Sequence, residues 1–247
     1  MRYLILSDIH ANLTALDAVL EAARGQWEKA VCLGDLVGYG PDPNEVIDRV
    51  RALPAVTIRG NHDKAISGLG DAEEFNPVAR DAVLWTRAQL RPENLDYLQK
   101  LPAGPLRVDA FSIVHGSVYD EDEYVFSPTL AIDGLLNAPS PVVFFGHTHI
   151  QGGFTLRGED VQVVAFKPEG GSRFAALTVE KDVQYLLNPG SIGQPRDGDA
   201  RAGFAIADLE NQSVEFWRVP YDIEDVQGRM ARAGLPQPLI QRLSVGH

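Results

Sequence analysis

The stretch VVFFGHTHI, residues 142–150, leads four apolar residues straight into a glycine and two histidines. An apolar run of this length is typical of a buried strand rather than of a surface helix. The chain has only six histidines, so it is notable that two of them follow one predicted strand. The same arrangement occurs at four further places.

Each of these four apolar runs also ends in carboxylate, imidazole or amide side chains. YLILS is followed by Asp8 and His10, VCLG by Asp35, VTIRG by Asn61, His62 and Asp63, and FSIV by His115. Since the carboxyl ends of parallel strands face one crevice, these side chains are expected to converge with His147 and His149. One such cluster alone would fit a turn or a helix cap, but the five together predict a metal site.

The first sixty residues alternate predicted strands with amphipathic helices. In NLTALDAVLEAAR, Leu13, Leu16, Val19 and Leu20 recur at helical spacing. PNEVIDRVRAL begins with Pro43, which favours the first turn of a helix. This alternation predicts parallel strands that are joined by helical crossovers.

The rest of the chain changes character twice. Residues 64–105 predict two helices and no strand, which we interpret as a helical insertion that could lie over a site. The next part is rich in strands, and residues 152–166 predict a hairpin that turns around RGED. Residues 222–247 predict two short helices broken at GLPQP. We therefore expect one α/β domain over 1–247, with two mostly mixed β-sheets packed together and helices on their outer faces.

The composition of the chain indicates which kinds of molecule it is expected to bind. A net charge of −12 argues against extended nucleic-acid binding, although a bound metal would still attract a small anionic substrate. No apolar run has the length of a membrane span, and Asp8 and His10 interrupt the pattern of a signal peptide. We expect a cytoplasmic protein without membrane contact. The single cysteine, Cys32, excludes an internal disulfide and is expected to be a packed core thiol.

The polar clusters form a set of motifs in a fixed order. They are D-x-H from Asp8, G-D-x-x-G at 34–38, G-N-H-D at 60–63, His115 in VHGS, and G-H-T-H at 146–149. In order and spacing the chain resembles the calcineurin-like metallophosphoesterases. The stretch NPGSIGQPRDGD resembles the small bacterial and archaeal phosphodiesterase branch of that superfamily. The resemblance implies a four-layer αββα sandwich with a two-metal site.

The resemblance also implies a role for each polar residue. Asp8, His10 and His149 would hold the first metal ion, Asn61, His115 and His147 the second, and Asp35 would bridge them. Oxygen and nitrogen donors suit two divalent transition-metal ions, and we expect Mn, with Fe, Zn or Ni as alternatives. A metal-bridging hydroxide would attack the phosphorus of a small phosphate ester. His62 would protonate the leaving oxygen, the alternative being a residue that only orients a ligand.

Two positions depart from relatives in the same superfamily. Protein Ser/Thr phosphatases and dinucleoside polyphosphate hydrolases carry G-D-x-x-D-R-G, whereas this chain has Gly38 and Tyr39 in place of the Asp and Arg. Phosphodiesterase activity is therefore favoured, and protein Ser/Thr phosphatase or dinucleoside polyphosphate hydrolase activity is the alternative. Arg196, Arg59 and Arg201 are candidates for the phosphate contact. A surface salt bridge is the simpler expectation for each, and Arg196 in GQPRDGD is the best candidate.

Other residues near the motifs have simpler interpretations. The acidic run YDEDEY, residues 119–124, is expected to be a solvated loop; if it rims the site, it would favour diesters over polyphosphates. Trp85 and Tyr97 are expected in the core rather than as base-stacking platforms. Asp63 is expected to cap a helix, with orientation of His62 as the alternative.

A function of another class also has to be considered. The same fold serves as a non-catalytic scaffold in the retromer subunit of the superfamily, and a nucleotide-binding regulator is a further alternative. Scaffolds of that kind can lose metal ligands or the leaving-group histidine. This chain fills all seven ligand positions and retains His62, which favours an enzyme.

Overall fold

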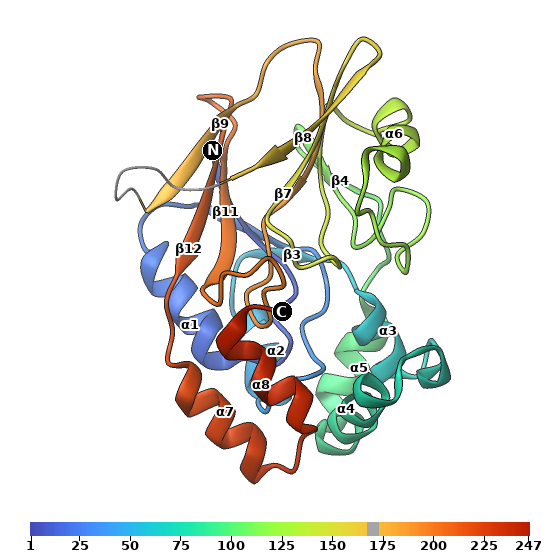
Figure 1. The fold of residues 1–247 in the computed structure, drawn as a ribbon, viewed down its shortest axis with the longest axis vertical. Helices are drawn as coiled ribbons and strands as arrows, with labels where there is room; N and C mark the ends of the chain where they lie inside the picture. Colours follow the sequence, from blue (N-terminus) through green and yellow to red (C-terminus); the bar gives the residue numbers. More distant parts are fainter. Residues whose placement is uncertain (167–172) are drawn as a thin grey trace.

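The computed structural model describes residues 1–166 and 173–247, and within them the strands form two six-stranded sheets (Figure 1). The first sheet contains β1 (Arg2–Leu6), β2 (Lys29–Cys32), β3 (Ala55–Thr57), β9 (Phe174–Thr178), β11 (Ala202–Asp208) and β12 (Ser213–Val219). The second contains β4 (Leu106–Val108), β5 (Phe111–Ile113), β6 (Val142–Phe144), β7 (Gly152–Arg157), β8 (Asp160–Ala165) and β10 (Gln184–Asn188). The strand orders are β3-β2-β1-β11-β12-β9 and β4-β5-β6-β10-β7-β8.

Both sheets are mixed, and each has a parallel part and an antiparallel part. In the first, β1, β2 and β3 are parallel, as the strand–helix alternation predicts. In the second, β5, β6 and β10 are parallel. Strands β7 and β8 form the predicted hairpin, in which Arg157 pairs with Asp160. Because two sets of parallel strands end at the same side of the sandwich, their following loops meet there.

Apolar side chains on the inner faces hold the two sheets together. One buried cluster joins Ile5, Val31 and Phe216 of the first sheet to Phe144 and Leu187 of the second. The outer faces are covered by helices, since α1 (Leu13–Ala22) contacts β11 and β12, and α6 (Pro128–Leu136) contacts β7, β8 and β10. The expected arrangement of two packed sheets with flanking helices is therefore confirmed.

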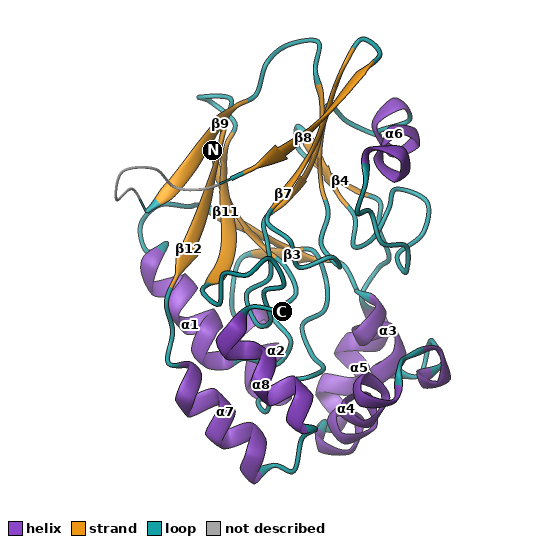
Figure 2. Ribbon diagram, in the orientation of Figure 1, coloured by secondary structure: helices purple, strands orange, loops and turns teal. Residues whose placement is uncertain are grey.

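Most helices gather beyond the strand ends, below the sheets in Figure 2. They are α2 (Pro43–Arg51), α3 (Asn61–Ser67), a 3-10 turn (Ala72–Glu74), α4 (Pro77–Gln89), α5 (Pro92–Lys100), α7 (Ile223–Arg232) and α8 (Gln237–Val245). The predicted helices of 64–105 and 222–247 are present. Helix α3 is an additional helix that was not predicted, and at its start the Asp63 carboxylate accepts a hydrogen bond from the amide of Gly60.

Besides α3 and the 3-10 turn, three elements were not predicted. Strands β4 and β9 lack a clear sequence signal because LRV is only three residues long and FAALT does not alternate apolar and polar residues. Helix α6 has a recognisable start, because the Ser127 side chain accepts a hydrogen bond from the Leu130 amide and Pro128 occupies the first turn. Over residues 1–166 and 173–247, no helix combines the length and apolar character needed to cross a bilayer.

Candidate metal centre

The polar residues that follow the parallel strands meet at one point of the structure. Seven side chains from both sheets lie there, namely Asp8, His10, Asp35, Asn61, His115, His147 and His149. Six of them are at most 3% exposed, and Asn61 is half-buried. Carboxylate and imidazole donors form two groups, in each of which the potential ligand atoms lie within 4.8 Å of one another.

Asp35 is the member that the two groups share. The first group is Asp8, His10, Asp35 and His149, and the second is Asp35, His115 and His147. Oδ2 of Asp35 lies 3.5 Å from Nε2 of His10 and 3.4 Å from Nε2 of His115. Oδ1 of Asn61 lies 3.1 Å from Nε2 of His115, which brings the amide to the second group. One carboxylate therefore faces donors from two directions.

The backbone at these residues adopts conformations that side chains normally disfavour. Left-handed φ angles occur at Asp8 (52°), His10 (48°), Asp35 (53°), His147 (64°) and His149 (60°). Such angles cost free energy in residues other than glycine and persist where the surrounding structure imposes them, often at functional sites. They turn successive side chains toward the same centre.

Glycine allows the close approach of two of the loops. A side-chain carbon added to Gly60 would lie 2.2 Å from Oδ1 of Asp35, which has no room for it. The same Oδ1 accepts a hydrogen bond from the amide of His62 over 2.9 Å. Asp35 is thus held by the start of α3 through one oxygen and presents the other to the imidazoles.

Backbone carbonyls select which nitrogen each imidazole presents. Nδ1 of His10, His115 and His149 lies at hydrogen-bonding distance from the carbonyls of Val37, Leu33 and Gln194, respectively. Because a carbonyl only accepts, Nδ1 carries a proton in each ring and Nε2 is the nitrogen that faces the centre. His147 is arranged the other way, since its Nε2 donates to the carbonyl of Asp122 and Nδ1 is left. Orientation of this kind is what metal-binding histidines require.

Burial keeps most of these imidazoles neutral. It lowers the pKa of His10 and His149, and it lowers the pKa of His147 to about 3. His115 is the exception, because the effect of burial is outweighed by the Asp35 carboxylate and the pKa rises to about 10. Burial opposes ionisation of Asp35, yet the neighbouring histidines hold its pKa well below the usual range. The metal-free centre therefore contains ionised carboxylates, the His115 imidazolium and three neutral imidazoles.

The donor set fits divalent metal ions. Asp8 and Asp35 are buried carboxylates whose ion-pair partners among the described residues are histidines, not lysine or arginine. Two buried carboxylates with the His115 imidazolium as their one cationic neighbour within residues 1–166 and 173–247 are costly, and metal ions would compensate the remaining charge. Oδ2 of Asp35 also has no hydrogen-bond donor in the described structure. Oxygen and nitrogen donors in two groups around one shared carboxylate are the residues that two transition-metal ions would need.

His62 lies beside this centre and is not a member of either group. Its ring packs against Tyr39 and Phe75, with centroids 4.4 and 4.8 Å away. Nδ1 of His62 is buried, and no hydrogen-bond partner for it is found among the described residues.

Asp63 does not orient the His62 ring, because the Asp63 carboxylate accepts hydrogen bonds from the amides of Gly60, Leu36 and Val37. Asp63 therefore caps α3, as expected, and fastens the loop after β2 to it.

A cavity of about 290 Å³ opens next to His62. It lies between the insertion helices and the acidic loop, and its lining includes Asn61, His62, His147, Tyr39, Tyr124, Lys64, Asp71, Glu74 and Asp122. A larger cavity of about 550 Å³ lies at the other end of the sandwich, between residues such as Phe111, Val183 and Leu209. The described residues around that larger cavity include neither group of potential metal ligands. The smaller cavity is therefore the candidate substrate pocket.

The acidic run 119–124 does rim the centre, and two of its four carboxylates form ion pairs. Glu121 is bound by Arg59 over 2.9 Å and Asp122 by Lys64 over 2.5 Å. Tyr124, at the end of the run, stacks on His147 with ring centroids 3.7 Å apart. The loop is therefore held against a candidate metal ligand rather than freely solvated.

The three candidate arginines have different partners. Arg59 and Arg201 form ion pairs with Glu121 and Asp199, as expected of salt-bridge residues. For Arg196 that expectation is wrong: its side chain is largely buried and donates to the Tyr39 hydroxyl and to Gln194. Its positive charge is also close enough to lower the pKa of His62. Arg196 is thus beside the centre.

Some residues of the site were missed by the sequence analysis. Tyr39 contacts His10 as well as His62, with ring centroids 4.5 Å apart, although the sequence indicated only that it replaces an arginine. Tyr124 was treated as part of a solvated run, and Arg242 gave no signal. Trp85 and Tyr97 pack in apolar clusters, as expected.

The C-terminal helices complete the surroundings of Tyr39. Val226 and Met230 of α7 and Leu239 and Leu243 of α8 are buried in one cluster with this ring. Figure 1 shows α8 running toward the loop that follows β10, and the amide of Gly198 in that loop donates to the carbonyl of Gly246 over 2.9 Å. The end of the chain is therefore packed against the candidate site.

Comparison with known proteins gives a consistent result. Residues 1–212 match the model of the calcineurin-like phosphoesterase superfamily domain. An uncharacterised protein of Methanocaldococcus jannaschii is 33% identical over 248 residues, covering 98% of this chain and 97% of that protein. The crystal structure of a metallophosphoesterase from Sphaerobacter thermophilus is similar, with 42% identity, a TM-score of 0.84, and coverage of 100% of this chain and 99% of that one.

A more distant structure shares the fold. A hypothetical protein from Pyrococcus horikoshii OT3 has 22% identity and a TM-score of 0.78, with 100% of this chain and 98% of that chain covered. The sequence match over most of the chain, together with the sandwich and the clustered Asp and His side chains, leads to one assignment. The chain belongs to the calcineurin-like phosphoesterase superfamily.

Proposed function

We propose that this protein is a metal-dependent phosphodiesterase that hydrolyses a small phosphate ester. One observation carries the proposal: two groups of buried donors share Asp35 and lie next to His62 at a pocket of about 290 Å³. We assign Asp8, His10 and His149 to a first ion, Asn61, His115 and His147 to a second, and Asp35 to both. Manganese is the proposed metal.

Two divalent ions at this position would neutralise phosphoryl oxygens and lower the pKa of a bound water. The chain supplies the remaining functions. Burial of the ligands excludes bulk water, and carbonyl contacts fix the imidazoles. Such positioning before the reaction is a large part of catalysis in hydrolases.

His62 is assigned to the leaving oxygen. Burial lowers its pKa to about 4 in the protein without substrate, so the free imidazole is neutral near pH 7. An anionic phosphate placed beside it favours the imidazolium form, because an opposite charge stabilises it. The substrate therefore raises the pKa of the residue that protonates its leaving group. Tyr39 packs on this ring, and Arg196, the proposed phosphate contact, donates to the Tyr39 hydroxyl.

The pocket favours a leaving group that is not strongly anionic. Three carboxylates, on Asp71, Glu74 and Asp122, line it together with one ammonium group, on Lys64. A leaving polyphosphate would meet net repulsion there, whereas a neutral alcohol would not. This charge distribution supports an ester over a dinucleoside polyphosphate as the substrate.

Turnover of bis-p-nitrophenyl phosphate tests the proposal. We expect hydrolysis that depends on added Mn²⁺, with Fe²⁺, Zn²⁺ and Ni²⁺ compared in the same assay. The His62→Ala variant should retain its metal and lose about 10²–10⁴ in kcat. A protein that binds metal fully yet turns over no phosphate ester would instead be a scaffold or a nucleotide-binding regulator.

A further inference from the structure

Two arginines meet at a single amide next to the proposed active site. Nη2 of Arg196 donates to Oε1 of Gln194 over 3.1 Å, and Nη1 of Arg242 donates to the same oxygen over 3.2 Å. Gln194 and Arg242 are 48 positions apart in the sequence, the latter in α8. The chain therefore brings two positive charges together although its net charge is −12.

The pair has no negative partner in the described part of the chain. Burial lowers the pKa of Arg242, and the positive charge of Arg196 lowers it further. The Tyr39 hydroxyl acts in the opposite direction. Tyr39 and Tyr124 are the neighbours of Arg196. Two like charges, partly withdrawn from water without a counter-ion, repel each other at a cost to stability. An anion between them would remove that cost.

Hydrogen-bond donors of this cluster are also unused. Nε of Arg196, Nε of Arg242 and Nε2 of Gln194 are all buried, and within the described structure none has an acceptor. A buried donor without an acceptor is rare and calls for a ligand or an ordered water. Three of them on mutually bonded side chains match an oxyanion with several acceptor oxygens, such as phosphate.

The cluster lies next to the reaction centre but outside the leaving-group pocket. Arg196 donates to the hydroxyl of Tyr39, whose ring packs on His10 and His62. The lining of the 290 Å³ pocket includes Tyr39 and His62 and neither arginine. An anion bound by the arginines would therefore lie outside the cavity assigned to the leaving group.

We propose that Arg196, Gln194 and Arg242 form a subsite for a second phosphate group, carried by the part of the substrate that stays on the reacting phosphoryl. That the phosphate belongs to a substrate rests on the proposed phosphodiesterase function. That the subsite binds an anion rests on the arginine pair. The preferred substrates are then diesters with a phosphate on the retained alcohol. Diesters with one phosphate lack a partner for this subsite.

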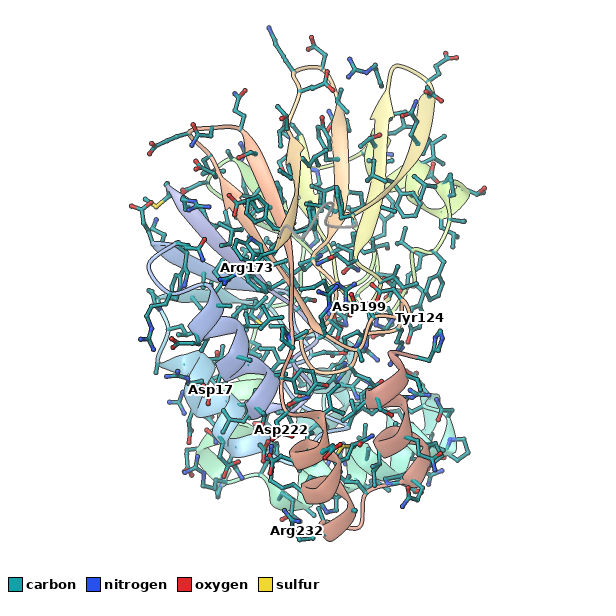
Figure 3. All side chains as sticks on the ribbon, turned by 60° about the vertical axis from the view of Figure 1, so that its left-hand side comes forward. Asp17, Tyr124, Arg173, Asp199, Asp222 and Arg232 are labelled. Atoms are coloured by element: carbon teal, nitrogen blue, oxygen red, sulfur yellow. The ribbon has the colours of Figure 1, made fainter. Side chains whose placement is uncertain are left out.

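Binding of inorganic phosphate to the metal-free protein tests the subsite without any turnover. Titration of the chelator-treated full chain with phosphate should give saturable binding, which Arg242→Met weakens about tenfold or more. Arg232→Met is the matched control, because Arg232 is an exposed arginine of the neighbouring helix α7. In Figure 3, Arg232 lies far from Tyr124, at the opposite end of the helical part of the molecule. Absence of binding, or equal weakening in both variants, overturns the subsite.

A second variant separates loss of the subsite from loss of folding. Gln194→Glu places a carboxylate between the two guanidinium groups with almost no change of shape. It should raise the melting temperature and abolish phosphate binding, because the anion is then supplied by the chain. A Gln194→Glu protein that binds phosphate as the wild type does contradicts the proposal.

Substrate preference distinguishes a subsite from a site for free phosphate. Two diesters with the same p-nitrophenyl leaving group, thymidine 5′-(p-nitrophenyl phosphate) and its 3′-phosphorylated form, differ only in the second phosphate. With Mn²⁺, kcat/KM should favour the 3′-phosphorylated diester about tenfold, and Arg242→Met should reduce that ratio toward one. A ratio of one in the wild type overturns the assignment to substrate. Failure to hydrolyse either diester overturns the phosphodiesterase proposal instead, while the phosphate titration still decides the anion site.

Discussion

Gly38 lies directly against His62: a side-chain carbon added to Gly38 would be 2.6 Å from Nδ1 of the imidazole. The glycine has a φ of +94°, which side chains rarely adopt. In relatives with G-D-x-x-D-R-G an aspartate stands at this position, whereas here the imidazole occupies the space. The ring is held by Tyr39 and Phe75 instead of by a carboxylate.

The Gly38→Ala variant should therefore lose activity without losing metal. The added methyl group displaces His62, and we expect kcat to fall about tenfold or more because proton transfer depends on its position. Gly25→Ala is the control, since Gly25 has a φ of +73° and no atom within 4 Å of the added carbon. Both variants share the backbone strain, so equal kcat values in the two would contradict the role of His62.

Asp35 should control the binding of both ions, and Asp8 the binding of one. Asp35 belongs to both donor groups, whereas Asp8 belongs only to the first. We expect Asp35→Asn to lose both metals on dialysis, because a neutral amide is a weaker ligand, and Asp8→Asn to retain about one per chain. Elemental analysis measures the difference. Equal metal content in the two variants would show that Asp35 is not shared.

The metal-free protein should lose stability as the pH falls from about 6.5 toward 4. Burial lowers the pKa of His62 to about 4 and that of His147 to about 3, so these imidazoles take up protons in the unfolded chain first. Because the unfolded state then binds more protons, the free energy of unfolding decreases with decreasing pH. His115 does not change the free energy of unfolding over this pH range. Its pKa of about 10 keeps it protonated in the folded protein, and below about pH 6.5 it is protonated in the unfolded chain as well.

Urea unfolding at several pH values measures this slope. His62→Gln removes one such imidazole, so its slope should be shallower by about 1.4 kcal/mol per pH unit. His247→Gln, at the exposed end of the chain, is the control. A His62→Gln slope as steep as the wild type would mean that His62 is not buried in its neutral form.

Arg59 should govern the affinity for anionic substrate through the acidic loop. It neutralises Glu121, and the same loop places Tyr124 on His147. In Arg59→Met we expect KM to rise several-fold, most strongly at low salt, because Glu121 then keeps only Lys64 as a partner, which Asp122 shares, and the excess negative charge at the rim repels the phosphate ester. Arg49→Met removes a comparable ion pair with the exposed Asp17 and should leave KM unchanged. Figure 3 places Asp17 on helix α1, far from Tyr124. A salt-independent KM in Arg59→Met would contradict this role.

The sequence predicted the strands of the site because each is a compact apolar run followed by polar residues. Asp8, Asp35, His115 and His147 could be placed at one edge, since parallel strands end at the same side of a sheet. Strand β9 and helix α6 could not be predicted in this way. Their residues are mostly apolar but follow neither a clear strand nor a clear helix period, and they are stabilised by packing on neighbouring elements rather than by their own pattern.

The sequence by itself determined which side chains stand at the strand ends, because residue type and spacing along one strand are local properties. Tertiary structure alone decided how these side chains group, that Arg196 meets Arg242 instead of a surface carboxylate, and that Tyr124 covers His147. Each of these contacts joins segments whose distance depends on how two sheets and the C-terminal helices pack. Packing of distant segments is a collective property of the whole core, so no local pattern specifies it.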